Sequence, residues 1–302
     1  WKLPADFSVV VGARHYWISS ALDSLQSNDT GYKARSSSDS APIFSGTLLY
    51  AGVPDTVLRG GFAQGYVYPT LVQAFTGSYF GASSTVRPNP DLKPETSNNW
   101  EIGARYDAGG LMVDASLFRS TAKHYIASLS CGLYGGTVSP CTAASETTYV
   151  NLDRAESTGM ELDARYHIAA LDVTPYATGG WIRRKYFFRS IQSGKSGVPT
   201  ISGRIGLRGE RSLWDGATGW ADLYMRGGSR SDELSLGSTA TSTPSVTRVP
   251  AWRTFNASFG TDIGAYHLAL DVLNLTNLTY ATNPDEANQP GRSVVFSVRA
   301  DF

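Results

Sequence analysis

The closing stretch, "RSVVFSVRADF", alternates between polar and apolar side chains. Counted back from the end, every second residue is apolar, at Phe302, Ala300, Val298, Phe296 and Val294. The residues between them are Asp301, Arg299, Ser297, Val295 and Ser293, of which only Val295 is apolar. A period of two places these sets on opposite faces of a β-strand. The segment therefore predicts a strand with one apolar face and one polar face.

The same alternation recurs along the chain, and no convincing amphipathic helix lies between the alternating segments. The pattern predicts about twelve antiparallel strands and an all-β fold. We expect them near residues 7–19, 42–50, 54–66, 97–107, 110–126, 147–168, 171–185, 199–211, 217–230, 250–262, 264–274 and 292–302.

The connections between these strands alternate in length. Short turns are expected at 51–55, 107–110, 169–172, 212–219 and 262–265. Long polar connections fall near 20–41, 67–96, 127–146, 186–198, 231–249 and 275–291. If every connection is a hairpin, the short turns gather at one end of the strands and the long loops at the other. This is the profile of a bacterial outer-membrane β-barrel, which has short periplasmic turns and long extracellular loops.

Composition and physics favour the same interpretation. Charged residues make up 17% of the chain, whereas a soluble domain carries about 25%. In hydrocarbon every backbone polar group must be paired, so only helices and closed barrels can span a membrane. A large soluble β protein is the alternative. Aromatic residues near strand ends suit the girdles at membrane interfaces, for example Tyr16, Trp17, Tyr50, Trp100, Tyr106, Tyr125, Tyr166, Trp181, Tyr186, Trp220, Trp252 and Tyr266.

Charge and cysteine usage restrict the partners and the compartment. Lys plus Arg and Asp plus Glu both number 26, and no basic stripe suggests a nucleic-acid partner. Cys131 and Cys141 flank a loop rich in Gly, Ser and Thr. Such a close pair predicts a disulfide in an oxidising compartment, and two free thiols are the alternative.

No chemistry of catalysis or metal binding emerges from the sequence. The four histidines have no metal-ligand spacing, and no serine lies in a Gly-x-Ser-x-Gly motif. We therefore expect neither an enzyme nor a resident cofactor or metal. The histidines are His15, His124, His167 and His267.

The segment 61–107 carries a family resemblance. It contains Asn89, Pro90, Asp91 and Leu92, followed by Lys93, Pro94 and Glu95 and by "NNWEIGARYD". Together with "NLDRAESTGMELDAR" (151–165), "DVLNLTNLTY" (271–280) and the terminal Phe302, this order resembles the C-terminal half of the barrel of TonB-dependent outer-membrane receptors.

The resemblance implies a barrel of 22 strands closed by an N-terminal plug. Residues 1–302 would supply about twelve strands of it, with the plug and the first strands upstream of Trp1. The implied partners are the TonB–ExbB–ExbD energy-coupling complex, reached through the upstream part, the outer-membrane lipid, and the barrel-assembly machinery, which reads Phe302 as a signal. In this arrangement Phe302, Ala300, Val298, Phe296 and Val294 face lipid.

A ferric siderophore is the expected cargo, and haem is the alternative within the family. The haem receptors carry a Phe-Arg-Ala-Pro-like box where this chain has "YVYP" (66–69), without the Arg and without a His before Asn89. A passive porin, a barrel enzyme and an adhesin are rival functions. Aromatic and cationic side chains near this box suit an anionic iron chelate, so the expected ligand-binding residues are Tyr66, Tyr68, Tyr79, Phe80 and Arg87.

The motif "NPDL" itself is expected to stiffen the connection that leads into the next strand, because Pro90 and Pro94 fix φ.

Overall fold

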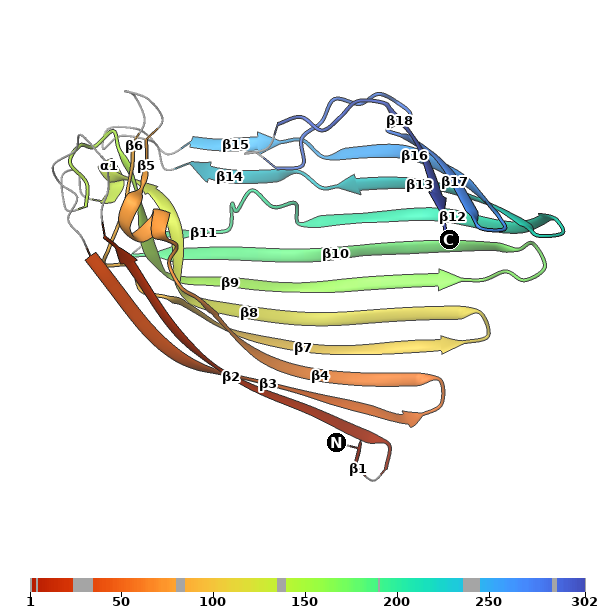
Figure 1. The fold of residues 1–302 in the computed structure, drawn as a ribbon, viewed down its shortest axis with the longest axis horizontal. Coiled ribbons are helices and arrows are strands. Elements are labelled where there is room, and N and C mark those ends of the chain that lie inside the picture. The colour runs from red at the N-terminus through yellow and green to blue at the C-terminus, as the bar shows by residue number, and fades with distance from the viewer. Residues whose placement is uncertain are drawn as a thin grey trace.

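The computed structural model describes residues 2–3, 5–23, 35–79, 85–134, 140–189, 191–235, 245–283 and 287–301. Its long strands run antiparallel in one curved sheet and follow one another in chain order (Figure 1). They match the twelve expected strands, and the expected all-β class is confirmed. The long strands are β2 (Phe7–Leu22), β3 (Arg35–Val53), β4 (Thr56–Val67), β7 (Glu95–Ala108), β8 (Leu111–Ser130), β9 (Thr147–Tyr166), β10 (Val173–Phe188), β12 (Ile201–Trp214), β13 (Ala217–Gly228), β16 (Trp252–Ile263), β17 (Tyr266–Leu273) and β18 (Ser293–Ala300).

Several short elements lie outside these strands. They are β1 (Lys2–Leu3), β5 (Ser78–Tyr79), β6 (Thr85–Arg87), β11 (Ile191–Ser193), β14 (Ser231–Ser235), β15 (Ser245–Val249), the π-helix η1 (Val72–Thr76) and the helix α1 (Cys131–Tyr134). The sequence did not predict them, because two to five residues are too few to show a period. No helix in the described ranges is long and apolar enough to cross a membrane.

The two ends of the sheet differ as the sequence predicted. Figure 1 shows tight turns and β1 at one end of the strands, and the other small elements and the long connections at the opposite end. The turn between β7 and β8 is only Gly109 and Gly110, both at positive φ, 58° and 83°. Glycine adopts this conformation without the steric cost that a side chain would bring. We call the two ends the short-turn end and the loop end.

The register of β18 shows which side chains share a face. Val294, Phe296 and Val298 lie opposite Val272, Leu270 and Leu268 of β17. The three β18 side chains are 65%, 66% and 59% exposed. A continuous exposed apolar face of this kind suits lipid and is unusual in a soluble protein. Ser297 and Arg299 lie on the other face, opposite Ala269 and His267.

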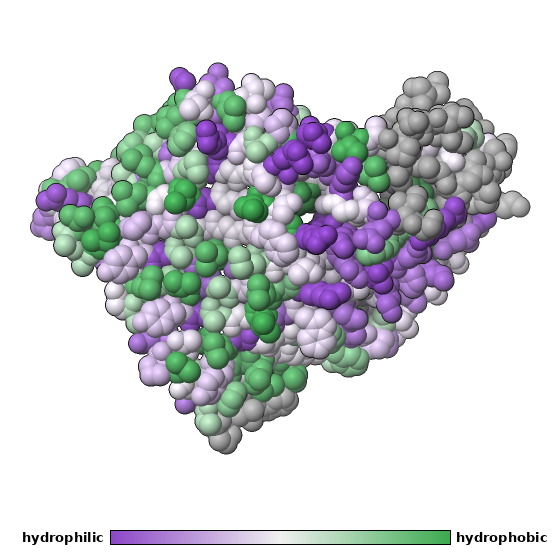
Figure 2. Space-filling model, turned by 180° about the vertical axis from the view of Figure 1, so that it is seen from behind, coloured by the Kyte–Doolittle hydropathy of each residue, from purple (hydrophilic) through white to green (hydrophobic). Residues whose placement is uncertain are grey.

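The expected faces are therefore confirmed for residues 294–300, whereas Phe302 lies outside the described residues. Figure 2, which views the molecule from behind, shows hydrophobic side chains spread over the strands and hydrophilic ones gathered towards the loop end. Within the described residues β2 and β18 do not pair, so the sheet is a segment of a barrel and not a closed one.

Aromatic residues form a girdle on the lipid face at the short-turn end. Tyr106, Tyr166 and Tyr266 are 41%, 48% and 56% exposed there. Trp220 and Trp252 do not belong to this girdle, contrary to the prediction from the sequence. Both lie on the opposite, lumen-facing side, in register with Gly260 and Gly228, and Trp252 is only 8% exposed. A place near a strand end does not make a girdle residue, because alternation alone decides the face.

Candidate functional site

Two of the expected ligand-binding tyrosines lie together at the loop end. The Tyr66 hydroxyl donates to Asp39 Oδ2 at 2.6 Å, and the Tyr68 hydroxyl donates to Ser37 Oγ at 2.7 Å. The Tyr66 ring also stacks on Tyr16, with the ring centroids 5.4 Å apart. We call these three tyrosines with Asp39 and Ser37 the tyrosine cluster.

The cluster forms where β4 separates from β3. Their last ladder pair is Ser45 with Ala63, and beyond it the Gln64 side chain accepts a hydrogen bond from the Phe44 amide at 3.1 Å. Past this point Tyr66, near the end of β4, and Tyr68, just after it, reach side chains of β2 and β3. Sequence reasoning named Tyr66 and Tyr68 but missed Tyr16 and Asp39 as neighbours, because 27 residues separate Tyr66 from Asp39.

Arg87 lies in a different environment from the tyrosines. Its Nε and Nη2 atoms both donate to Glu146 Oε1, at 2.9 and 2.8 Å, and Nη2 also donates to Thr142 Oγ1 at 2.9 Å. Its strand β6 pairs in parallel with the start of β9, where Arg87 lies opposite Thr148. The guanidinium is thus engaged within the chain, and its role in ligand binding stays a prediction.

Glu146 is held as an anion by several donors. Its Oε2 accepts from the backbone amides of Thr142 and Ala143 at 2.7 and 3.0 Å. Burial by itself would raise the pKa of Glu146, but the hydrogen bonds from Arg87, Thr142 and Ala143 lower this pKa to about 2. Both side chains are mostly buried, with Arg87 18% and Glu146 11% exposed. We call this pair the loop latch, because it joins the 68–94 connection to the 131–146 connection.

The disulfide lies next to the latch. Cys131 and Cys141 are bonded, with their Cα atoms 5.8 Å apart. Both residues are buried, and the Cys131 amide donates to the Glu146 carbonyl at 2.9 Å. The disulfide and the latch therefore hold the same connection at two points.

The "NPDL" motif makes structural contacts. Asn89 is 6% exposed, and its amide nitrogen donates to the Tyr149 carbonyl at 2.8 Å. Its Oδ1 accepts from the Asp91 amide at 3.0 Å, closing a turn. Lys93 exchanges two hydrogen bonds with Asn151, at 2.8 and 2.9 Å. These contacts fix the connection that leads into β7 against β9. The stiffening expected from Pro90 and Pro94 stays a prediction. Of the remaining expected residues, Tyr79 pairs through its backbone with Thr85, and Phe80 lies outside the described residues.

Breaking the latch should loosen the connection that carries the disulfide. We expect Glu146→Gln to lower the free energy of opening this connection by about 1.5–3 kcal/mol, the usual contribution of a hydrogen bond to a charged group. Because the folded pKa of Glu146 is depressed, its contribution is present above the ordinary carboxyl range and is lost as the pH falls towards 2. Limited proteolysis of the full-length receptor at several pH values measures both effects.

The matched control for this experiment is Glu210→Gln. Glu210 is 59% exposed and meets Arg208 at 3.6 Å, so its loss should change stability by under about 0.5 kcal/mol. If both variants are cut at the wild-type rate from pH 7 to pH 3, the latch does not hold the connection.

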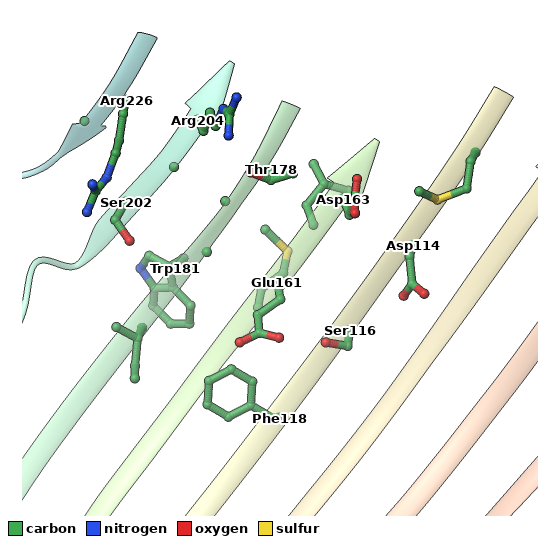
Figure 3. A pocket seen from close by; sticks show the side chains of 18 of the residues that line it. Asp114, Ser116, Phe118, Glu161, Asp163, Thr178, Trp181, Ser202, Arg204 and Arg226 are labelled. Carbon is green, nitrogen blue, oxygen red and sulfur yellow. The ribbon is translucent and has the colours of Figure 1, made fainter. Parts of the chain in front are cut away.

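Charged side chains form a row across the lumen-facing side of the strands. The register places Asp114 of β8 opposite Asp163 of β9, and continues through Thr178 of β10 to Arg204 of β12 and Arg226 of β13. The row is therefore acidic on β8 and β9 and basic on β12 and β13 (Figure 3). Together with Ser116 and Glu161, these residues border a hollow of about 960 Å³.

Ion pairs fix part of this wall. Arg59 donates to Glu101 at 3.0 Å and meets Asp114 at 2.8 Å. Glu161 and Asp163 are exposed and have no ion-pair partner among the described residues. A wall with separated acidic and basic sides offers water, a polar solute or a protein insert many places to bind. Among the described residues no three His, Cys, Asp or Glu side chains converge on one point as metal ligands would.

Comparison with known proteins identifies the family. The family model described as TonB dependent receptor-like, beta-barrel, matches residues 1–278. The chain belongs to the TonB-dependent receptors. The expected family is thus confirmed, and with it the location in the bacterial outer membrane as part of a β-barrel. The family consists of receptors and transporters and not of enzymes.

Individual relatives show both the fold and the extent of the match. An iron-regulated outer membrane virulence protein of Vibrio cholerae serotype O1 is 35% identical over 112 residues, which is 36% of this chain and 17% of that protein. The copper transporter OprC matches with a TM-score of 0.75 and 17% identity, over 100% of this chain and 46% of that one. The ferric yersiniabactin uptake receptor FyuA of Yersinia pestis gives 0.66 and 20%, over 100% and 44%. The chain thus spans less than half of the length of each of these proteins.

Proposed function

We propose that this chain is part of an active importer of a ferric siderophore, driven through the TonB–ExbB–ExbD complex. Family membership supports energy-coupled import. Two relatives support iron as the element carried, because one is iron-regulated and another is a receptor for ferric yersiniabactin. The expected plug, which lies upstream of Trp1 in this proposal, would occlude the lumen and connect the receptor to TonB.

The tyrosine cluster is the observation that carries the siderophore assignment. At the loop end the Tyr66 ring stacks on Tyr16, and the hydroxyls of Tyr66 and Tyr68 are already hydrogen-bonded to Asp39 and Ser37. Such rings can stack on the aromatic or flat part of an iron chelate, and their hydroxyls can bond its oxygens. The row from Asp114 to Arg226 provides a polar wall on the lumen-facing side of the strands.

An uptake assay tests the proposal in the full-length receptor. The cells lack other siderophore receptors, and the probe is radioactive iron on a panel of ferric siderophores or in haem. We expect uptake of at least one ferric siderophore that disappears without TonB. Tyr66→Ala with Tyr68→Ala should weaken binding of that siderophore more than ten-fold, since each lost stacking or hydrogen-bonded contact is worth about 1 kcal/mol.

Tyr266→Ala is the control, because Tyr266 is a lipid-facing tyrosine at the short-turn end and should leave uptake unchanged. Uptake of haem alone, or an open pore in single-channel recordings without TonB, would contradict the siderophore assignment. An unchanged affinity in the double variant would contradict the site while leaving the function in place.

A further inference from the structure

A group of cations lies on the outer surface of the sheet near the loop end. The ladder places Arg119 of β8 and Arg183 of β10 on either side of Thr158 of β9. In the next row towards the loops, Lys185 lies opposite Glu156. In the row after that, Lys123 lies opposite Arg154. We call Arg119, Lys123, Arg154, Arg183 and Lys185 the basic patch.

The patch lies on the lipid face and not in the lumen. Side chains two residues apart along a strand share a face. Arg119 is two residues from Leu117, and Arg183 is two residues from Trp181. Leu117 and Trp181 both lie opposite Met160, and the three side chains are 52%, 37% and 44% exposed. This row is the last apolar row before the cations begin, so the patch lies directly above the apolar surface.

Among the residues that the structure describes, one acid faces these five cations. Glu156 pairs with Arg154 at 2.9 Å and meets Arg119 at 3.8 Å. Arg154 also lies over the Phe187 ring at 4.2 Å. Lys123, Arg183 and Lys185 have no ion pair among the described residues. Arg119 and Arg154 are 62% and 45% exposed. The patch therefore has four positive charges in excess at the edge of the membrane region.

An apolar hollow adjoins the patch on the same face. It has a volume of about 590 Å³ and is bordered by Met160, Leu162, Trp181, Ile201, Ile205 and Met225. Its floor is a row of three glycines on neighbouring strands, because Gly203 lies opposite both Gly179 and Gly227. A Cβ atom on Gly203 would come within 2.6 Å of the Thr178 carbonyl oxygen. The close approach of the strands thus requires glycine here and leaves the surface hollow.

We propose that the basic patch and the hollow together bind lipid A, the phosphorylated glycolipid of the outer leaflet. Arginine forks bind phosphate with two parallel hydrogen bonds. Arg119 and Arg183 are two strand spacings apart, or about 10 Å, so they can bind separate phosphates of one headgroup. The hollow then takes an acyl chain below the headgroup. Trp181 borders both regions and lies at the level where tryptophan anchors a protein at the membrane interface.

A lipid-retention experiment tests this site in the purified full-length receptor. The probes are bis-phosphorylated lipid A, the same lipid without its phosphates, and phosphatidylglycerol, each added in detergent micelles and counted on the receptor by native mass spectrometry. We expect the receptor to retain bis-phosphorylated lipid A at least ten-fold more than either other lipid. The triple variant Arg119→Gln, Arg183→Gln and Lys185→Gln should lose most of this preference.

The control triple variant is Arg105→Gln, Arg165→Gln and Arg208→Gln. It removes the same charge from the lumen-facing side, in register with Asp114, Tyr176 and Asp222, and should retain lipid A within two-fold of wild type. Ile205→Trp fills the hollow and should weaken retention of lipid A while leaving the patch intact. If the triple variant fails to assemble, Arg183→Lys keeps the charge, loses the fork and should reduce retention two- to five-fold.

Equal retention by the two triple variants would overturn the site. Equal retention of lipid A with and without phosphate would overturn the role of the patch. Retention of phosphatidylglycerol at the level of lipid A would overturn the lipid A assignment and leave a general anionic-lipid surface.

Discussion

Replacing Phe296 with arginine is expected to prevent assembly of the full-length receptor, whereas the same replacement at the next residue, Ser297, should leave it assembled. Phe296 lies in β18 opposite Leu270, and its side chain is 66% exposed on the lipid face. An arginine near the middle of the lipid face of a barrel costs about 2–4 kcal/mol. This is a large part of the 5–15 kcal/mol by which folded proteins are typically stable.

Ser297 provides a matched control at a distance of one residue. It lies opposite Ala269 on the lumen-facing side, where water can solvate an added guanidinium. The amount of heat-modifiable barrel in outer-membrane fractions measures assembly of both variants. Equal amounts of the two variants would contradict the predicted difference between the faces of β18, and more of Phe296→Arg than of Ser297→Arg would show that the faces are reversed.

The fold was largely predictable because alternation is a local property. Each long strand carries its own period of two, and β18 needed no knowledge of its partner to be recognised. The short strands β14 and β15 differ, since their pairing from Ser231 to Val249 depends on two segments meeting in space. Trp220 and Trp252 were assigned to the membrane girdle from position alone, and the register moved both to the lumen-facing side.

The candidate site was predictable only in part. A local box predicts Tyr66 and Tyr68, and the structure adds Tyr16, whose ring stacks on Tyr66. The partner of Arg87 lies 59 residues away in sequence, and no local pattern signals such a contact. By contrast, Arg183 and Lys185 interrupt the apolar set of β10 beyond Trp181. That change from apolar to cationic on one face was a readable signal of the membrane boundary.

The lumen-facing wall contains one ion pair that is more buried than its neighbours. Asp222 of β13 is 11% exposed in its side chain and lies 2.5 Å from Arg204 Nη2. The Tyr176 hydroxyl donates to its two carboxylate oxygens at 2.8 and 3.1 Å. Arg204 also lies over the Tyr224 ring, 3.6 Å from its centroid. Asp222 therefore joins side chains of three neighbouring strands, β10, β12 and β13.

Removing this carboxylate should destabilise the barrel by about 3 kcal/mol, because Asp222→Ala leaves a partly buried guanidinium and a hydroxyl without their acceptor. Asp222→Asn keeps an acceptor for Tyr176 and should cost less than the alanine variant. Asp163→Ala, in an exposed aspartate of the same wall, should change stability by no more than about 0.5 kcal/mol. Guanidinium unfolding of the full-length receptor in detergent micelles measures all three variants. If Asp222→Ala and Asp163→Ala unfold at the same denaturant concentration, the ion pair between Asp222 and Arg204 does not stabilise the barrel. Water then solvates Arg204 equally well, and the backbone hydrogen bonds between the strands hold the wall.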